Sequence, residues 1–174
     1  MVEIEVKIKI QDFQVLKQNI AKRKVTLDKP RHLEENILYD FPDQRLYKKD
    51  QALRLRRIDK KYYLTFKGPH QKSRKFKIRE EFETEIKNGK QFRSILKSLG
   101  LIPVFQYRKN RTQYKKKNLK ICLDEMPIGS FLELEGEREE IVRFAEELGY
   151  TKDEFIKLDY VQLIKKAGIR TQPD

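Results

Sequence analysis

Three stretches of the chain place two glutamates one residue apart on an alternating pattern: Glu3-Ile4-Glu5, Glu81-Phe82-Glu83 and Glu133-Leu134-Glu135. An amphipathic helical pattern follows each of them, over residues 12–24, 88–99 and 137–148. Because residues i and i+2 of a strand share a face, each glutamate pair forms one acidic row. The apolar residue between the glutamates faces the other way, where the following helix can bury its own apolar stripe. The acidic rows then face water in an open sheet, or one another in a closed barrel.

Length and composition predict a single globular domain. The chain has 174 residues, of which 38% are hydrophobic and 39% charged, so one core of ordinary size is expected. We expect a domain at 1–168 and a frayed tail at 169–174. No apolar run reaches the length of a membrane span, and the sequence starts directly in a strand pattern, so we expect no signal peptide and a cytoplasmic protein. Cys122 is the only cysteine, so an intramolecular disulfide is excluded. We interpret Cys122 as a passive small residue.

The charge balance favours an anionic partner. Lys and Arg number 40 against 27 Asp and Glu, giving a formal net charge of +13. A surplus of this size attracts nucleic acid, anionic lipid or phosphate-rich metabolites. Nucleic acid is the weakest of these predictions, because no exposed face combines aromatic residues with basic neighbours as stacking platforms do.

Alternation and turn signals predict eight strands, mostly antiparallel, because the connecting segments are short. The expected strands are 2–10, 33–41, 51–58, 61–67, 76–86, 104–115, 119–124 and 131–135. A fourth helix is expected at about 153–167. Gly68-Pro69 is expected to end a strand, and Phe41-Pro42-Asp43 with Gln44 is expected to form a turn.

The polar faces of these strands collect seven acids and seven bases on one side of the sheet. The acids are Glu3, Glu5, Glu81, Glu83, Asp124, Glu133 and Glu135, and the bases are Lys7, Arg54, Arg56, Lys67, Arg79, Lys109 and Arg111. Charge balance on a solvated face needs fewer charges than this. We therefore interpret the set as the lining of a charged site.

The residue types indicate a metal–polyphosphate site. Carboxylates without a nearby histidine or cysteine suit Mg²⁺ or Mn²⁺ rather than zinc, and neither His32 nor His70 is expected on the charged face. Arg and Lys suit phosphate, Arg as a bidentate donor and Lys as a point charge. The chain lacks a Walker-type glycine loop and a GxGxxG motif. The general base is then a metal-activated hydroxyl or water, or a lysine such as Lys7 or Lys67 with a shifted pKa.

At this point the motifs resemble those of a known family. Glu3-x-Glu5-x-Lys7 resembles the ExExK signature of the CYTH superfamily, the triphosphate tunnel metalloenzymes. The resemblance runs in order through about residues 2 to 165. It includes residues 36–43, Leu53-Arg54-Leu55-Arg56, Thr65-Phe66-Lys67-Gly68, Arg79-x-Glu81-x-Glu83, Lys109-x-Arg111, Leu123-Asp124-Glu125 and Gly129-x-Phe131-x-Glu133-x-Glu135. Within the superfamily, the chain looks most like the class IV adenylyl cyclase and thiamine triphosphatase-like branch.

The resemblance implies an α+β fold, a closed eight-stranded antiparallel β-barrel with helices packed outside. It implies metal-site acids at Glu3, Glu5, Asp124, Glu133 and Glu135, with Glu81 and Glu83 across the tunnel. It implies triphosphate binders at Lys7, Arg54, Arg56, Lys67, Arg79, Lys109 and Arg111. The implied cofactor is Mg²⁺ or Mn²⁺, and the implied partner is a triphosphate-containing small molecule bound by a monomer or homodimer.

Three functions fit this tunnel. A cyclase would convert ATP to cyclic AMP and pyrophosphate. A triphosphatase would hydrolyse tripolyphosphate, thiamine triphosphate or a nucleoside triphosphate. A non-catalytic module would bind polyphosphate or nucleic acid without turnover. The two enzymes differ in which phosphorus lies in line with the nucleophile, and the strand motifs alone do not decide this.

Overall fold

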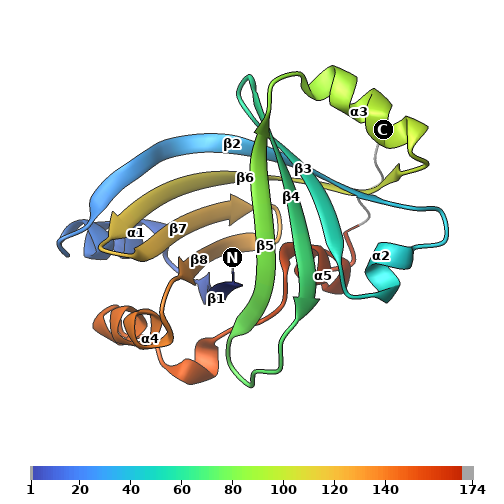
Figure 1. The fold of residues 1–174 in the computed structure, drawn as a ribbon. Coiled ribbons are helices and arrows are strands. Elements are labelled where there is room, and N and C mark those ends of the chain that lie inside the picture. The colour runs from blue at the N-terminus through green and yellow to red at the C-terminus, as the bar shows by residue number, and fades with distance from the viewer. Residues whose placement is uncertain (1, 170–174) are drawn as a thin grey trace.

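Eight antiparallel strands close into one barrel in the computed structural model, which describes residues 2–169 (Figure 1). The strands are β1 (Val2–Ile10), β2 (Thr26–Asp40), β3 (Ala52–Ile58), β4 (Lys61–His70), β5 (Lys77–Ile86), β6 (Ile102–Lys116), β7 (Leu119–Met126) and β8 (Gly129–Glu135). Their order around the barrel is β1-β5-β4-β3-β2-β6-β7-β8, and β8 pairs with β1 to close it. The predicted closed eight-stranded barrel with helices outside is confirmed.

The helices lie on the outer surface of the barrel. They are α1 (Phe13–Ala21), α2 (Arg45–Lys48), α3 (Gly89–Ser98), α4 (Arg138–Glu147), the 3₁₀ helix η1 (Lys152–Glu154) and α5 (Tyr160–Lys166). Leu16 and Ile20 of α1 share a core cluster with Ile141 and Phe144 of α4, against the outer face of β1, β7 and β8. Among residues 2–169, none of the helices has the length and the apolar composition of a membrane span.

The second strand–helix repeat does not pack as predicted. Phe82, between the two glutamates of β5, is 54% exposed. Helix α3 instead buries Leu96 against Tyr39 of β2 and Leu55 of β3. Helix α3 begins after Asn88, whose side chain caps the helix by accepting a hydrogen bond from the amide of Gln91 (3.0 Å).

The predicted helix at 153–167 is interrupted. Between η1 and α5 the backbone is extended at Ile156, which exchanges two hydrogen bonds with Lys7 of β1 (3.1 and 2.7 Å). Asp159 then starts α5, because its carboxylate accepts from the amide of Gln162 while the Gln162 side chain accepts from the amide of Asp159. Tyr160 and Ile164 of α5 then pack in one core cluster with Phe105 and Tyr107 of β6.

Three other segments differ from the sequence-based expectations. Strand β2 begins at Thr26 instead of residue 33, because it pairs with the long β6 across register shifts near Pro30. Strand β4 continues to His70, and a register shift after Lys67 accommodates Gly68-Pro69. The short helix α2 follows the predicted turn. The predicted tail at 169–174 lies outside the described residues except for Ile169.

Candidate active site

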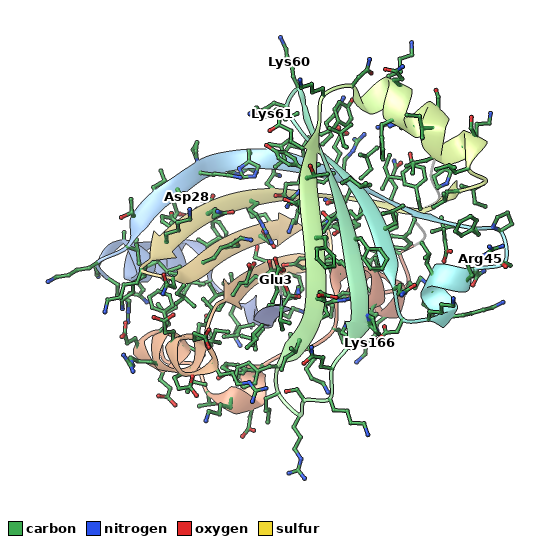
Figure 2. All side chains as sticks on the ribbon, viewed as in Figure 1. Glu3, Asp28, Arg45, Lys60, Lys61 and Lys166 are labelled. Atoms are coloured by element: carbon green, nitrogen blue, oxygen red, sulfur yellow. The ribbon has the colours of Figure 1, made fainter. Side chains whose placement is uncertain are left out.

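Alternation places the predicted charged residues on the inner face of the barrel. They line one tunnel cavity of about 130 Å³, whose wall includes every predicted site residue except Asp124. Figure 2 illustrates the contrast: Glu3 lies among the strands, whereas Lys60, Lys61 and Arg45 project from the outside. The tunnel is therefore a product of strand register, because a shift by one residue would turn all these side chains outward.

Asp124 forms the buried anchor of the tunnel. Its side chain is fully buried and accepts hydrogen bonds from Lys109 Nζ (3.0 Å), Arg111 Nε and Nη2 (both 2.6 Å) and the Tyr160 hydroxyl (2.5 Å). These donors occupy both carboxylate oxygens. Asp124 thus positions two cations of the wall, and as the side chains lie it does not face the cavity as a metal ligand would.

Lys7 lies between two acids of the same wall. Its Nζ is 2.7 Å from Glu5 Oε1 and 3.2 Å from Glu133 Oε2, and Lys77 Nζ is also 2.7 Å from Glu5 Oε1. Burial opposes the charge of Lys7, but Glu5 and Glu133 outweigh burial and raise the pKa of Lys7. Lys7 is therefore an ammonium ion at neutral pH, and Glu5 is already neutralised by two lysines.

Another part of the tunnel is rich in acid. Burial, together with the carboxylates of Glu135 and Glu81, raises the pKa of Glu3 to about 8. The shift reflects first the cost of burying the charged carboxylate and then its repulsion by the two neighbouring acids. Within residues 2–169, no three or more Asp, Glu, His or Cys side chains are already gathered as a metal site. Mg²⁺ does not require this, because it keeps waters and takes one or two carboxylates together with substrate phosphates. The oxygen donors around Glu3 fit such an ion.

The two arginines of β3 form a cationic wall. Arg56 Nη2 donates to both oxygens of Glu83 (2.7 and 2.9 Å), and its Nη1 lies 3.3 Å from Glu34 Oε1. Arg54 Nη2 donates to the Thr65 hydroxyl (3.1 Å). The Nε atoms of both arginines are buried without a hydrogen-bond partner among the described residues. These orphaned donors leave capacity for an anionic ligand.

Lys67 and Arg79 complete the wall. Lys67 pairs with Glu81, yet burial and the nearby charges of Arg54 and Lys77 lower the pKa of Lys67 to about 7. Arg79 donates from Nε to the carbonyl of Gly68 (2.7 Å) and from Nη2 to the carbonyls of residues 50 and 67 (3.0 and 3.2 Å). Part of the hydrogen-bonding capacity of Arg79 is therefore used by backbone carbonyls of β4 and of the segment before β3.

The residues that the sequence-based set missed include four direct partners of its charged members: Glu34, Lys77, Lys120 and Tyr160. Lys77 and Lys120 share strand parity with predicted residues, so alternation alone could have found them. Glu34 lies within the predicted strand 33–41 but was not assigned to its charged face, and Tyr160 comes from a helix and gave no signal. The expectation of no histidine on the charged face is wrong for His32, whose Nε2 lies 3.5 Å from Glu34 Oε1.

The comparisons with known proteins agree with this geometry. The sequence matches the CYTH domain over residues 1–157, and the chain belongs to that family. A protein of Methanocaldococcus jannaschii named "Putative adenylate cyclase" is 32% identical, over 94% of this chain and 98% of that protein. The resemblance inferred from the short motifs is therefore confirmed at the level of the family.

Solved structures share the fold. A "putative adenylate cyclase" from Vibrio parahaemolyticus matches with a TM-score of 0.86 and 18% identity, covering 95% of this chain and 98% of that one. A "putative adenylyl cyclase" from Hippeastrum, described as having a dominant triphosphatase activity, matches with a TM-score of 0.70 and 20% identity, covering 95% and 96%. At these identities the likeness concerns the barrel.

Proposed function

We propose that this chain is a metal-dependent enzyme that processes a triphosphate inside the tunnel, as a class IV-like adenylyl cyclase that converts ATP to cyclic AMP and pyrophosphate. The observation that carries the proposal is the cavity inside the closed barrel, with orphaned arginine donors on β3 and a crowded acid cluster around Glu3. A chain of phosphates with bound cations is complementary to both. The name of the M. jannaschii relative supports the choice of reaction.

Glu3, Glu135 and Glu81 are the residues that would hold Mg²⁺ or Mn²⁺. When bound, the ion neutralises phosphate charge and lowers the pKa of a coordinated oxygen. Glu81 and Glu135 each pair with a lysine, Lys67 and Lys120 respectively. The other predicted metal acids, Glu5, Asp124 and Glu133, are each paired with two buried cations. We assign these three acids to positioning the cationic wall.

The chain's own residues bind, orient and accept a proton. Arg54 and Arg56 hold the phosphate chain with charge-assisted hydrogen bonds and stabilise the charge that develops on its oxygens. The ribose 3′-oxygen bonds to the α-phosphorus, the bond from that phosphorus to the β-bridging oxygen breaks, and pyrophosphate leaves. Lys67, whose pKa of about 7 makes much of its amine neutral, accepts the hydroxyl proton. Lys7 remains charged and binds phosphate.

A triphosphatase is the second candidate function. The same wall would bind tripolyphosphate, and Lys67 could accept a proton from water as well as from a hydroxyl. The reaction then depends on whether the α- or the terminal phosphorus lies near the neutral amine.

One incubation distinguishes the two reactions. The purified protein is supplied with ATP or with tripolyphosphate, under Mg²⁺ and under Mn²⁺, and the products are separated by chromatography. Cyclic AMP with pyrophosphate identifies the cyclase, and orthophosphate identifies the triphosphatase. Binding of both compounds without any product under either metal would leave only the non-catalytic module.

Lys67→Met is expected to abolish turnover, because the neutral amine accepts the proton. In the wild type, kcat is expected to rise as the pH passes about 7, since the active form of Lys67 is the deprotonated one. The measurement is kcat against pH with saturating metal. Lys60→Met, at an exposed turn outside the barrel, is the matched control and keeps the wild-type profile. Normal turnover in Lys67→Met would refute the assignment of the base.

A further inference from the structure

A second cavity adjoins the tunnel. This vestibule, of about 410 Å³, lies between α2, the first residue of β3, the last residue of β4 and α5, and its wall includes Tyr47, Asp50, His70 and Phe105. The volume is within the usual range of small-molecule sites. The vestibule and the tunnel share part of their wall: Leu38, Ala52, Arg79, Asp159 and Val161. The two cavities therefore adjoin each other at these residues.

The rim of the vestibule presents an aromatic ring. Tyr47 on α2 is 68% exposed, the most exposed of the large hydrophobic side chains among the described residues. The backbone beneath it is held in place, because the Asp40 carboxylate accepts hydrogen bonds from the amides of Leu46 (3.0 Å) and Tyr47 (2.9 Å). Lys165 of α5 lies 5.3 Å from the Tyr47 ring centroid and 5.8 Å from that of Phe105. The ring is thus a pre-positioned surface for stacking.

Two polar residues of the vestibule wall, His70 and Asp50, hold each other in place. His70 Nδ1 lies 2.7 and 2.8 Å from the two Asp50 oxygens, and the His70 amide donates to Asp50 Oδ2 (2.7 Å). Asp50 has a left-handed backbone (φ 54°), and Arg79 donates to its carbonyl. Because the Asp50 carboxylate accepts from Nδ1, the neutral imidazole carries its proton there and leaves Nε2 as an acceptor. An acceptor of this kind suits a hydroxyl group.

We propose that the vestibule binds the nucleoside part of a nucleoside triphosphate, with Tyr47 stacking on the base and His70 accepting a hydrogen bond from a ribose hydroxyl. The inference rests on the proposed function. The phosphate chain of the nucleoside triphosphate would lie in the tunnel, and its nucleoside part would reach the vestibule past Arg79. The proposal makes Tyr47 and the His70–Asp50 pair determinants of specificity. Inorganic tripolyphosphate has no group for them to contact.

The test compares two ligands on the same variants. Equilibrium dissociation constants for ATP and for tripolyphosphate are measured for Tyr47→Ser, His70→Ala and the control Phe82→Ala, an exposed ring on the outer face of β5. Each vestibule variant is expected to weaken ATP binding by about tenfold, as expected when one stacking or hydrogen-bonding contact is lost. Tripolyphosphate binding is expected to stay unchanged in all variants, and the control is expected to leave both unchanged.

The ribose contact has its own measurement. Wild type is expected to prefer ATP over 2′,3′-dideoxy-ATP, and His70→Ala is expected to lose this preference while Tyr47→Ser keeps it. Equal losses of ATP and tripolyphosphate, or no loss of either, would overturn the vestibule proposal and leave the triphosphate tunnel standing. Failure of the wild type to bind either ligand would overturn the proposed function and the vestibule proposal with it. The surface position of Tyr47 keeps the test valid if His70→Ala folds poorly.

Discussion

Glu5→Gln is expected to destabilise the metal-free protein strongly, whereas Glu3→Gln is expected to stabilise it. Glu5 is 8% exposed and neutralises Lys7 and Lys77 at 2.7 Å each. Among the described residues, Lys77 has no other ion pair. Removing one partner of a buried pair costs about 3–5 kcal/mol, which for a domain of this size lowers Tm by about 6–20 °C.

The expected change in stability has the opposite sign at Glu3, because burial and the repulsion of neighbouring acids both disfavour its charged form. Its pKa of about 8 exceeds the ordinary value of 4.5, so the folded state binds this proton more tightly than the unfolded state does. Stability is therefore lost as the pH rises from 4.5 through 8. Glu3→Gln removes both the buried charge and its repulsion, so its Tm should exceed that of wild type by a few degrees above pH 8 and match it near pH 4.5.

Thermal melting in a chelator, on both sides of pH 8, measures both effects. The control is Glu80→Gln, which also removes one negative charge. Glu80 is exposed on the outer face of β5 and does not line the tunnel. Added Mg²⁺ should raise the Tm of wild type more than that of Glu3→Gln, because the ion relieves the same repulsion. Equal Tm values for Glu5→Gln and Glu80→Gln would show that Glu5 does not neutralise the two lysines.

The sequence predicted the inward face well because a strand has a period of two. Once Glu3 and Glu5 share a face, Lys7 must join them, and the same parity brings Arg54 and Arg56 inside. Closure of the barrel then gathers residues far apart in the chain into one cavity. This step did not depend on side-chain detail, which is why short motifs were sufficient to predict the architecture.

The predictions that failed depend on tertiary contacts. The repeat of strand and helix gave no indication that α3 would cover Leu55 and leave Phe82 exposed. The helix expected at 153–167 is interrupted because Ile156 pairs with Lys7, a contact between residues far apart in sequence. The pairing of individual charges could not be predicted from the sequence either. Parity puts Glu5 and Asp124 on the correct face, but only the geometry shows that buried cations already neutralise both.

These ion pairs also set the condition for binding. Arg56 is held by Glu83, whose side chain is 36% exposed, and by the buried Glu34. A triphosphate must compete with Glu83 for the guanidinium, and it can do so because it brings several charges and its own cations. A monophosphate offers fewer contacts along the same wall. The tunnel should therefore discriminate by phosphate chain length.

Arg56→Ala is expected to weaken tripolyphosphate binding by at least tenfold, since a charge-assisted hydrogen bond is worth about 1.5–3 kcal/mol. Orthophosphate should lose much less. The matched control is Arg57→Ala, because the next residue of β3 points out of the barrel toward Glu35. Arg56→Lys keeps the charge but loses the planar fork, so its affinity should fall between those of wild type and Arg56→Ala. Titration calorimetry at fixed Mg²⁺ measures all three, after a melting curve establishes that each is folded. Similar losses in Arg56→Ala and Arg57→Ala would mean that binding follows overall charge, and the triphosphate would then not lie against β3 inside the tunnel.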